Sequence, residues 1–363
     1  MRLHEIPTPA LIVDIKVMGR NIQRMAQFYA SSSCKLRPHF KAHKTPAIAR
    51  RQLAAGSCIG LTCGTVGEAE LIVREGLTQD VLIANQVVGP GKAARVAELA
   101  AQADVKVAVD SEAGLADLAQ AARARGVEVG VLVEVNIGHR CGVAPGESAL
   151  MLAKRVAAAD GVRLCGLMGY EGHAVAIEDR PEREARARQA LDRLLSTVRI
   201  IQEAGLPCEI VSAGGTGTYD ITGRMDGVTE IQAGSYVLMD TAYAKLDLPF
   251  ELAFSVLGTV LSCQRPDMCV ADSGHKACTM DHGNPSVKGI EGAAVAFLAD
   301  EHAIITLPPE STIAVGDRIE LWPSHIDPTI NLHDVLYAVD GDEVVEVWPI
   351  AARGYREQRE RPG

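Results

Sequence analysis

The sequence predicts an α/β protein in which a (β/α)8 barrel of the TIM type is followed by an antiparallel β domain. From residue 36 to about residue 236, short runs that are apolar on both faces alternate with stretches of helical periodicity. This alternation is typical of buried parallel strands and their crossover helices. The apolar runs cover residues 36–40, 58–62, 81–84, 105–109, 131–135, 164–168, 209–212 and 229–233. Eight such β/α units close into a TIM-type barrel.

The helical stretches begin and end at suitable capping residues. They cover residues 45–55, 66–75, 91–102, 112–125, 147–159 and 182–204. Thr65 and Ser111 stand at expected N-caps, and Gly76, Gly126 and Gly205 stand where helices should stop. An open doubly wound sheet is the alternative, but it would carry a phosphate-binding turn after its first strand. Here the glycine-rich loop at 212–218 follows the seventh strand, which is typical of a barrel.

The texture changes after about residue 240, where short segments are punctuated by Gly, Pro and Asp, as in an antiparallel β domain. These segments cover residues 256–262, 270–272, 293–298, 303–307, 318–321, 334–339 and 343–348. The early run at 10–14 is expected to join them, with a helix at 16–31 that leads into the barrel. We therefore expect a barrel domain at 16–240 and a β domain made of 1–15 and 241–363.

Composition excludes several classes of protein. The chain has 363 residues, a net charge of -10 and a pI near 5.5, so a nucleic-acid surface, which needs clustered Lys and Arg, is not expected. No apolar run approaches the ~20 residues that cross a bilayer, and residues 1–9 lack the pattern of a signal peptide. Nine scattered cysteines without a CxxC pair predict reduced thiols. We therefore expect a cytoplasmic protein without nucleic-acid or membrane partners.

Polar residues that follow the barrel strands indicate an active site, because the carboxyl ends of these strands meet at one mouth. Lys41 follows the first strand, where a lysine of lowered pKa can act as a Schiff-base nucleophile. Lys44 competes for this role, but it begins the next helix and is expected to be solvated, so we favour Lys41. The other polar residues at this mouth are Cys63, Thr65, Asn85, Gln86, Asn136, Arg140, Tyr170, Glu171 and His173.

The glycine-rich loop suits a phosphate dianion, because its backbone N–H groups and hydroxyls converge. Glycine clusters also make plain turns, so the loop alone is weak evidence for a phosphate site. It becomes stronger evidence together with Lys41, which is expected across the barrel mouth. A lysine that faces a phosphate cradle is the layout that pyridoxal 5'-phosphate (PLP) needs. The expected phosphate-binding residues are Ser212, Gly215, Thr216 and Gly217, with Gly234, Ser235 and Tyr236 as a second arm.

Two further residues at the mouth have open interpretations. Arg140 suits the phenolic oxygen of PLP or a carboxylate, and a salt bridge on the rim is an equally good interpretation. Tyr170 suits stacking on the cofactor ring or a hydrogen bond to it, and a core tyrosine is the plain alternative.

A possible metal site lies far downstream, at His325 and Asp327. In a strand-like run these two side chains point to the same side. One imidazole and one carboxylate suit a hard or borderline divalent ion, with waters filling the remaining positions. Such a pair is more often a structural hydrogen bond, and His333-Asp334 is a competing pair.

Together these features resemble the fold-type III PLP enzymes, whose barrel is shared with alanine racemase. The closer resemblance is to the metal-dependent branch of D-threonine aldolase, 3-hydroxy-D-aspartate aldolase and D-serine dehydratase. The segments that carry it are residues 8–10, 37–44, 84–90, 140–143, 214–217, 230–236, 323–329 and 351–354. They occur in order along nearly the whole chain, and as a set they are specific.

The resemblance implies a role for most of these residues. It implies that Lys41 carries PLP, that Arg140 lies near the ring oxygen, and that the glycine-rich loop and residues 234–236 hold the phosphate. His39, Gln86 and Tyr170 are expected among the cofactor-binding residues. The resemblance also implies that His325 and Asp327 bind a divalent ion. D-serine dehydratases of this branch generally have Cys and zinc at the second position, so Asp327 favours manganese, magnesium or a similar ion, with zinc as the alternative.

One segment departs from the family pattern. The aldolases have a histidine further behind the tyrosine that corresponds to Tyr170, whereas here His173 stands closer and Glu171 is unusual. We expect His173 or a water beside the metal to take the proton of the substrate hydroxyl, unless the site serves another substrate.

The expected reaction is retro-aldol cleavage of a 3-hydroxy-D-amino acid to glycine and an aldehyde. The alternative on the same site is β-elimination to a 2-keto acid and ammonia. A racemase would need no metal, and a PLP-homeostasis protein would usually lack the C-terminal β domain. The expected partner is a small amino-acid substrate, and the resemblance implies a homodimer.

Overall fold

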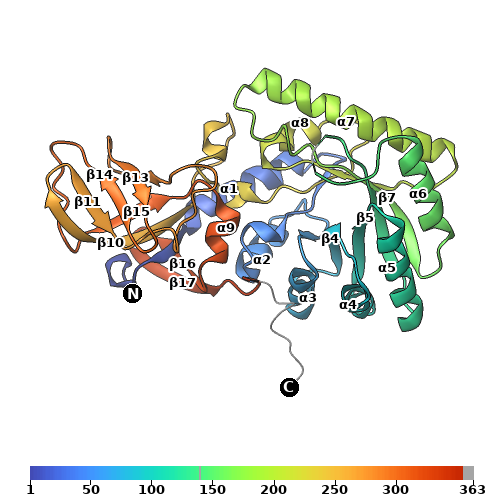
Figure 1. Ribbon diagram of the computed structural model, residues 1–363, viewed down its shortest axis with the longest axis horizontal. Coiled ribbons are helices and arrows are strands. Elements are labelled where there is room, and N and C mark those ends of the chain that lie inside the picture. Colours follow the sequence, from blue (N-terminus) through green and yellow to red (C-terminus); the bar gives the residue numbers. More distant parts are fainter. Residues whose placement is uncertain (139, 355–363) are drawn as a thin grey trace. The chain divides into compact units, whose positions relative to one another are not determined.

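The computed structural model describes residues 1–138 and 140–354. These residues form two compact units, drawn in Figure 1. The barrel unit contains residues 25–41 and 48–234, and the β unit contains residues 1–24, 42–47 and 235–354. Each unit has a sheet of its own.

Eight parallel strands form the sheet of the barrel unit, in the order β2-β9-β8-β7-β6-β5-β4-β3. Isolated parallel bridges between Leu36 and Cys58 and between His39 and Thr62 join the two end strands. The predicted barrel class is therefore confirmed. The strands are β2 (Lys35–Leu36), β3 (Leu61–Cys63), β4 (Asp80–Gln86), β5 (Asp104–Val109), β6 (Val129–Glu134), β7 (Val162–Met168), β8 (Ile210–Ala213) and β9 (Glu230–Ile231).

The first strand is shorter than the sequence predicts. A strand was expected at 36–40, but β2 ends at Leu36, and Phe40–Ala42 form a 3-10 turn (η2). Pro38 interrupts the run because it has no N–H to donate to a ladder. Lys41 therefore lies in a turn after the strand and not on the strand itself.

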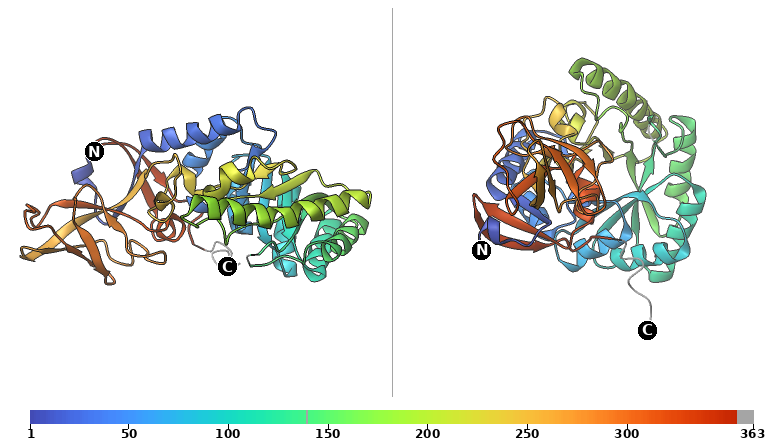
Figure 2. Two further views of the ribbon diagram at one scale, coloured as in Figure 1. Left: turned by 90° about the horizontal axis from the view of Figure 1, so that it is seen from above. Right: turned by 60° about the vertical axis from the view of Figure 1, so that its left-hand side comes forward.

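The predicted helices are confirmed, and those of the barrel unit, such as α4, α5, α6 and α7, lie outside its sheet (Figures 1 and 2). Thr65 and Ser111 are N-caps that accept the N–H groups of Glu68 and Gly114. Gly126 ends its helix in the left-handed region, at φ 73°. The helices are α1 (Ile15–Tyr29), α2 (Pro46–Ala54), α3 (Val66–Arg74), α4 (Pro90–Ala100), α5 (Glu112–Arg125), α6 (Glu147–Ala158), α7 (Arg180–Glu203) and α8 (Tyr219–Thr222).

Buried charges fill the amino-terminal end of the barrel. The Arg37 guanidinium, 1% exposed, lies 2.6 Å from Asp80 and 3.0 Å from Glu230, and the Lys106 ammonium lies 2.8 Å from Asp80. Burial by itself would raise the pKa of Asp80, but the two cations outweigh it and lower that pKa. Since buried charges are tolerated only when they are paired, we assign this end of the barrel to stability and the opposite mouth to function.

The β unit is built on a nine-stranded sheet in which β1 (Ala10–Asp14) pairs antiparallel with β10 and parallel with β16. The early strand therefore joins the C-terminal strands, as expected. The remaining strands are β10 (Phe254–Arg265), β11 (Met268–Ala271), β12 (Ser286–Val287), β13 (Ala294–Leu298), β14 (Ala303–Thr306), β15 (Arg318–Trp322), β16 (Val335–Asp340) and β17 (Glu343–Pro349).

The strand-like interpretation of 325–327 is wrong. His325 is the extended N-cap residue of a short helix, α9 (Ile326–Asn331), and Asp327 lies in the first turn of that helix. A carboxylate and Pro328 in a first turn are both favoured at a helix start. The two side chains therefore do not project from the same face of a strand.

Glu251 forms ion pairs with helix α1. Its carboxylate accepts hydrogen bonds from Arg20, at 2.8 and 3.0 Å, and from Arg24, at 2.6 Å. These bonds lower the pKa of Glu251 to about 2. Because the folded-state pKa is lowered, this stabilisation is present above the ordinary value of 4.5 and is lost as the pH falls from there toward about 2.

Glu251→Gln should lower the free energy of unfolding at pH 7 by less than about 1 kcal/mol, because the Glu251 side chain is 42% exposed. The difference from the unchanged chain should shrink when urea unfolding is repeated near pH 3. An equal loss at both pH values would show that the charge of Glu251 has no part in the stabilisation.

Candidate active site

Lys41 packs against the backbone that follows β3. A methyl group added at Gly64 would lie 3.8 Å from Lys41 Cβ and 3.9 Å from Lys41 Cδ. Gly64 is itself held in place, because its N–H donates to Glu68 at 2.8 Å and its carbonyl accepts from Asn85 at 3.0 Å. The Lys41 stem thus rests on a fixed surface, while the residue remains exposed.

The competing lysine has a different environment. Lys44 Nζ donates to Asn331 Oδ1 at 2.9 Å, inside the β unit. Its backbone has φ 52°, and its carbonyl accepts the Ala352 N–H. These bonds give Lys44 a structural role and leave Lys41 as the better candidate nucleophile. His39, which precedes Lys41 in the chain, donates its N–H to the Ala233 carbonyl at 3.2 Å.

A buried carboxylate that sequence inspection missed lies at the end of β6. Glu134 is 2% exposed and accepts hydrogen bonds from the Gln86 amide and, at 3.3 Å, from the Cys141 thiol. Burial raises the pKa of Glu134, in spite of these bonds and of the nearby Arg140 charge. Glu134 was hidden in the apolar run 131–135, although a charged residue in such a run is itself a signal.

The glycine-rich loop requires its glycines. Gly214 has φ 77°, and a methyl group there would lie 2.7 Å from Ile231. At Gly217 the methyl group would lie 1.8 Å from the Val175 carbonyl oxygen, so no larger residue fits. The loop therefore folds more tightly than a plain surface turn, and Thr216 and Ser212 are buried within it.

Tyr170 and Glu171 both lie close to this loop. A methyl group at Gly215 would lie 3.3 Å from the Tyr170 ring. Glu171, 0% exposed, accepts the Gly214 N–H at 3.2 Å, the Thr218 hydroxyl at 2.7 Å and the Thr222 hydroxyl. Glu171, which looked unusual in the sequence, is the support of the loop.

His173 lies beside the loop that follows β6. A methyl group at Gly138 would come within 2.9 Å of the imidazole ring of His173, and Gly138 has φ 124°, which favours glycine. His173 is exposed. Its role as the base stays a prediction.

The predicted second phosphate arm is divided between the two units. Gly234 ends the barrel unit, whereas Ser235 and Tyr236 belong to the β unit. The Ser235 carbonyl accepts the Met239 N–H at 2.7 Å, and the Tyr236 ring, 1% exposed, packs 5.6 Å from the Phe250 ring. Their assignment to the phosphate stays a prediction.

Substituting the tightest glycine should test the cradle. In Gly217→Ala the methyl group must displace the Val175 backbone, so we expect PLP affinity to fall by about tenfold or more, with a stability loss of about 1–3 kcal/mol. Fluorescence titration with PLP measures the first and urea unfolding the second. Gly91→Ala is the matched control, because no atom lies within 4 Å of its added methyl group. Unchanged PLP affinity in Gly217→Ala would remove the loop from the cofactor site.

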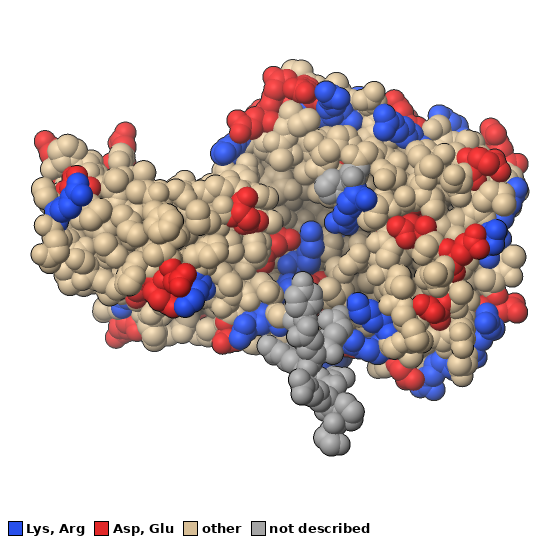
Figure 3. Space-filling view, in the orientation of Figure 1, with Lys and Arg blue, Asp and Glu red and all other residues tan. Residues whose placement is uncertain are grey.

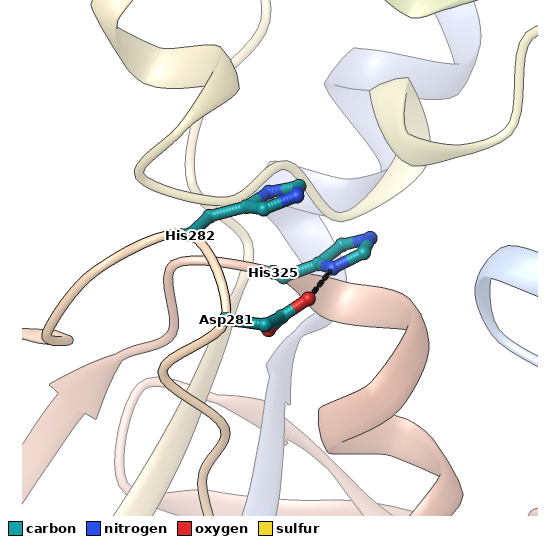
Figure 4. A group of neighbouring side chains, drawn as sticks. All are labelled: Asp281, His282 and His325. Carbon is teal, nitrogen blue, oxygen red and sulfur yellow. Dashed lines mark hydrogen bonds and ion pairs between the residues drawn. The ribbon is translucent and has the colours of Figure 1, made fainter.

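A group of candidate metal ligands lies at the start of α9, and of the two predicted ligands it contains His325 but not Asp327. Asp281, His282 and His325 have potential ligand atoms within 4.8 Å of one another (Figure 4). His325 Nδ1 lies 2.6 Å from Asp281 Oδ2, and the rings of His282 and His325 stack at 4.1 Å. Asp281 and His282 were missed, although the adjacent Asp and His letters were an available signal.

The charges of this group influence one another. Burial by itself would raise the pKa of Asp281, but the hydrogen bond and charge of His325 outweigh it and lower that pKa. Burial and the neighbouring His325 lower the pKa of His282. An ionised carboxylate beside a neutral imidazole is a donor set that divalent ions favour.

Asp240 is hydrogen-bonded to the first residue of helix α9. Its carboxylate accepts the Tyr243 N–H at 2.9 Å and the Ile326 N–H at 3.2 Å. Burial raises the pKa of Asp240 to about 6. This carboxylate fixes the turn that carries His325 and Asp327.

The competing pair is engaged elsewhere. His333 Nε2 lies 2.7 Å from the Ala277 carbonyl oxygen, and Asp334 is paired with Arg353. Burial lowers the pKa of His333, in spite of that hydrogen bond. His333-Asp334 therefore belongs to the packing of the β unit.

The residues present fit both implied groups. A lysine on a fixed turn and a cradle without room for a methyl group suit the aldehyde and the phosphate of PLP. His325, with carboxylates nearby, suits a divalent ion. The barrel unit thus carries residues that suit PLP, and the β unit carries residues that suit a divalent ion.

Sequence models of two families match the two regions of the chain. Residues 13–242 match the alanine racemase N-terminal domain, and residues 253–339 match a putative serine dehydratase domain. Together with the barrel, they define a PLP enzyme of the alanine racemase-like class.

Comparison with individual proteins narrows the class. The chain is 38% identical to a D-threonine aldolase of Arthrobacter sp., over 97% of this chain and 94% of that protein. It is 35% identical to a 3-hydroxy-D-aspartate aldolase of Paracoccus denitrificans (strain Pd 1222), over 96% and 93%. The crystal structure of D-threonine aldolase from Filomicrobium marinum matches with a TM-score of 0.94 and 41% identity, over 97% of each chain. The chain belongs to the family of D-threonine and 3-hydroxy-D-aspartate aldolases.

A dehydratase is also among the relatives. A D-threo-3-hydroxyaspartate dehydratase of Delftia sp. (strain HT23) is 30% identical, over 94% of this chain and 97% of that protein. The same architecture therefore serves both cleavage and elimination.

Proposed function

We propose that this chain is a PLP- and metal-dependent aldolase that cleaves a 3-hydroxy-D-amino acid of the D-threonine type to glycine and an aldehyde. The observation that carries this proposal is the full-length likeness to D-threonine aldolase. The Lys41 turn, the glycine-rich loop and the His325 group supply the parts that such a reaction needs.

Most of the residues that would hold the cofactor belong to the barrel unit, and Ser235 and Tyr236 belong to the β unit. Lys41 would bind it through its amine, and Ser212, Gly215, Thr216 and Gly217 would hold its phosphate, together with Gly234, Ser235 and Tyr236. His39, Gln86, Arg140 and Tyr170 would surround its ring. When bound, PLP supplies an electron sink for the carbanion that remains when the Cα–Cβ bond breaks.

The residues of the β unit would hold the divalent ion. We assign His325 and Asp327 as its ligands, and the ion would lower the pKa of the substrate 3-hydroxyl. His173 would accept the hydroxyl proton as the bond breaks, and Lys41 would return a proton to the glycine carbon. We propose manganese or magnesium as the ion, with zinc as the alternative, because a second ligand that is a carboxylate favours harder ions.

Product identification separates this function from its rival. Purified protein with PLP and MnCl2 is incubated with D-threonine, D-serine and 3-hydroxy-D-aspartate in turn. Glycine and acetaldehyde from D-threonine support the aldolase. Accumulation of 2-oxobutyrate from D-threonine, or of pyruvate from D-serine, with release of ammonia, would establish the dehydratase instead.

We also propose a cytoplasmic homodimer that binds neither nucleic acid nor membranes. All nine cysteines are free thiols, five of them buried, which suits a reducing compartment.

Val345 and Val347 are nearly half exposed on edge strand β17, where apolar side chains often mark an interface. Lys and Arg side chains lie interspersed with Asp and Glu on the face drawn in Figure 3. None of the described helices is both long and apolar enough to cross a membrane.

A further inference from the structure

The His325 imidazole is held from two sides. On its edge, Nδ1 lies 2.6 Å from Asp281 Oδ2; on its face, the His282 ring lies parallel, with 4.1 Å between centroids and 8° between planes (Figure 4). Asp281 and His282 come from the loop between β11 and β12, so they are independent of the helix that His325 caps.

The edge contact determines which nitrogen of His325 is available. An ionised carboxylate only accepts hydrogen bonds, so Nδ1 must carry the hydrogen that Asp281 accepts. In a neutral imidazole the other nitrogen, Nε2, then carries the lone pair. A histidine that binds a metal commonly donates its second N–H to a carboxylate in this way, which fixes its tautomer and its orientation.

The face contact determines what His282 can do. A divalent ion binds an imidazole nitrogen in the plane of the ring; for Zn²⁺ the distance is about 2.0–2.1 Å. Two parallel rings whose centroids lie 4.1 Å apart lie in different planes, so a single ion cannot lie in the plane of both rings. The stacked pair can therefore offer one good ligand to a single ion.

We infer that Asp281 is a positioning residue of the metal centre, which orients His325 so that Nε2 binds the divalent ion, and that His282 supports the His325 ring by stacking without being a ligand. This inference rests on the proposed function, because it takes His325 as a metal ligand. It adds Asp281 and His282 to the metal centre, and it gives the first an orienting role and the second a stacking role.

Metal affinity separates these roles from direct ligation. Binding of Mn²⁺ to the holoenzyme is measured by electron paramagnetic resonance for the unchanged chain, Asp281→Asn, His282→Phe and His325→Ala. Asp281→Asn should weaken binding by about 10- to 100-fold. His282→Phe keeps a stacking ring without nitrogen ligands, so its affinity should stay within about threefold, which corresponds to ~0.7 kcal/mol.

The tautomer of His325 gives a readout that needs no metal. In ¹⁵N-resolved NMR spectra of the metal-free protein, the His325 ring should carry its hydrogen on Nδ1, and Asp281→Asn should mix the two tautomers. Asp281→Glu should restore the Nδ1 hydrogen. The same spectra report whether each variant is folded.

The outcomes distinguish the inference from the proposed function. If Asp281→Asn binds Mn²⁺ as tightly as the unchanged chain, or if His282→Phe loses the ion, the assigned roles are wrong while the metal site stands. If His325→Ala binds as well as the unchanged chain, the metal site of the proposed function is wrong, and the inference with it.

Discussion

Lys41→Ala should abolish turnover and the yellow colour of the purified protein together. The Lys41 amine is the proposed covalent anchor of PLP. Its removal should eliminate the absorbance band at ~420 nm that PLP bound to a lysine amine gives. We expect turnover of D-threonine to fall by at least about three orders of magnitude, as is usual when a covalent nucleophile is removed. Absorbance spectra and an aldehyde assay measure the two losses.

Lys44→Ala is the control for this prediction. Lys44 lies three residues away, but its ammonium group is bound to Asn331, so the variant should keep the yellow colour and most of the turnover. A colourless Lys44→Ala protein beside a yellow Lys41→Ala protein would exchange the roles of the two lysines.

Removal of the divalent ion should have the second large effect. Treatment with EDTA should lower turnover of D-threonine by about two orders of magnitude or more, because the 3-hydroxyl then loses the charge that lowers its pKa. Added MnCl2 should restore the activity of the unchanged chain but not that of His325→Ala.

His302→Ala is the matched control, because His302 is an exposed histidine in the same unit and does not belong to the His325 group. Its activity should respond to EDTA and MnCl2 as that of the unchanged chain does. Turnover that is insensitive to EDTA would contradict a metal-assisted aldolase and revive a racemase, which needs no metal.

The barrel could be predicted from the sequence because its strands are buried on both faces and its helices carry clear caps. The runs that form β4 to β7 are mostly apolar, in spite of charged residues such as Lys106 and Glu134. Thr65 and Ser111 cap the helices as expected. The first strand was predicted too long, because Pro38 interrupts the ladder and only an isolated bridge at His39 follows it. Short elements such as β12 and α9 carry too few residues for a periodic signal.

Sequence inspection could propose site residues where a polar residue stands at a strand end, and it missed residues that act through contacts with distant neighbours. Lys41 and the glycine-rich loop can be recognised directly in the amino-acid sequence. The support of that loop by Glu171, and the bond between Asp281 and His325, join residues 43 to 51 and 44 positions apart. Such partners follow from the path of the chain in space, which pattern alone does not provide.

The most direct test of this account is to identify the lysine that carries PLP. Sodium borohydride makes the attachment of PLP to a lysine amine permanent, and mass spectrometry of the digested holoenzyme then locates the modified residue. We predict a pyridoxyl group on Lys41 and none on Lys44. Modification of Lys44, or of a lysine outside the 37–44 segment, would contradict the account.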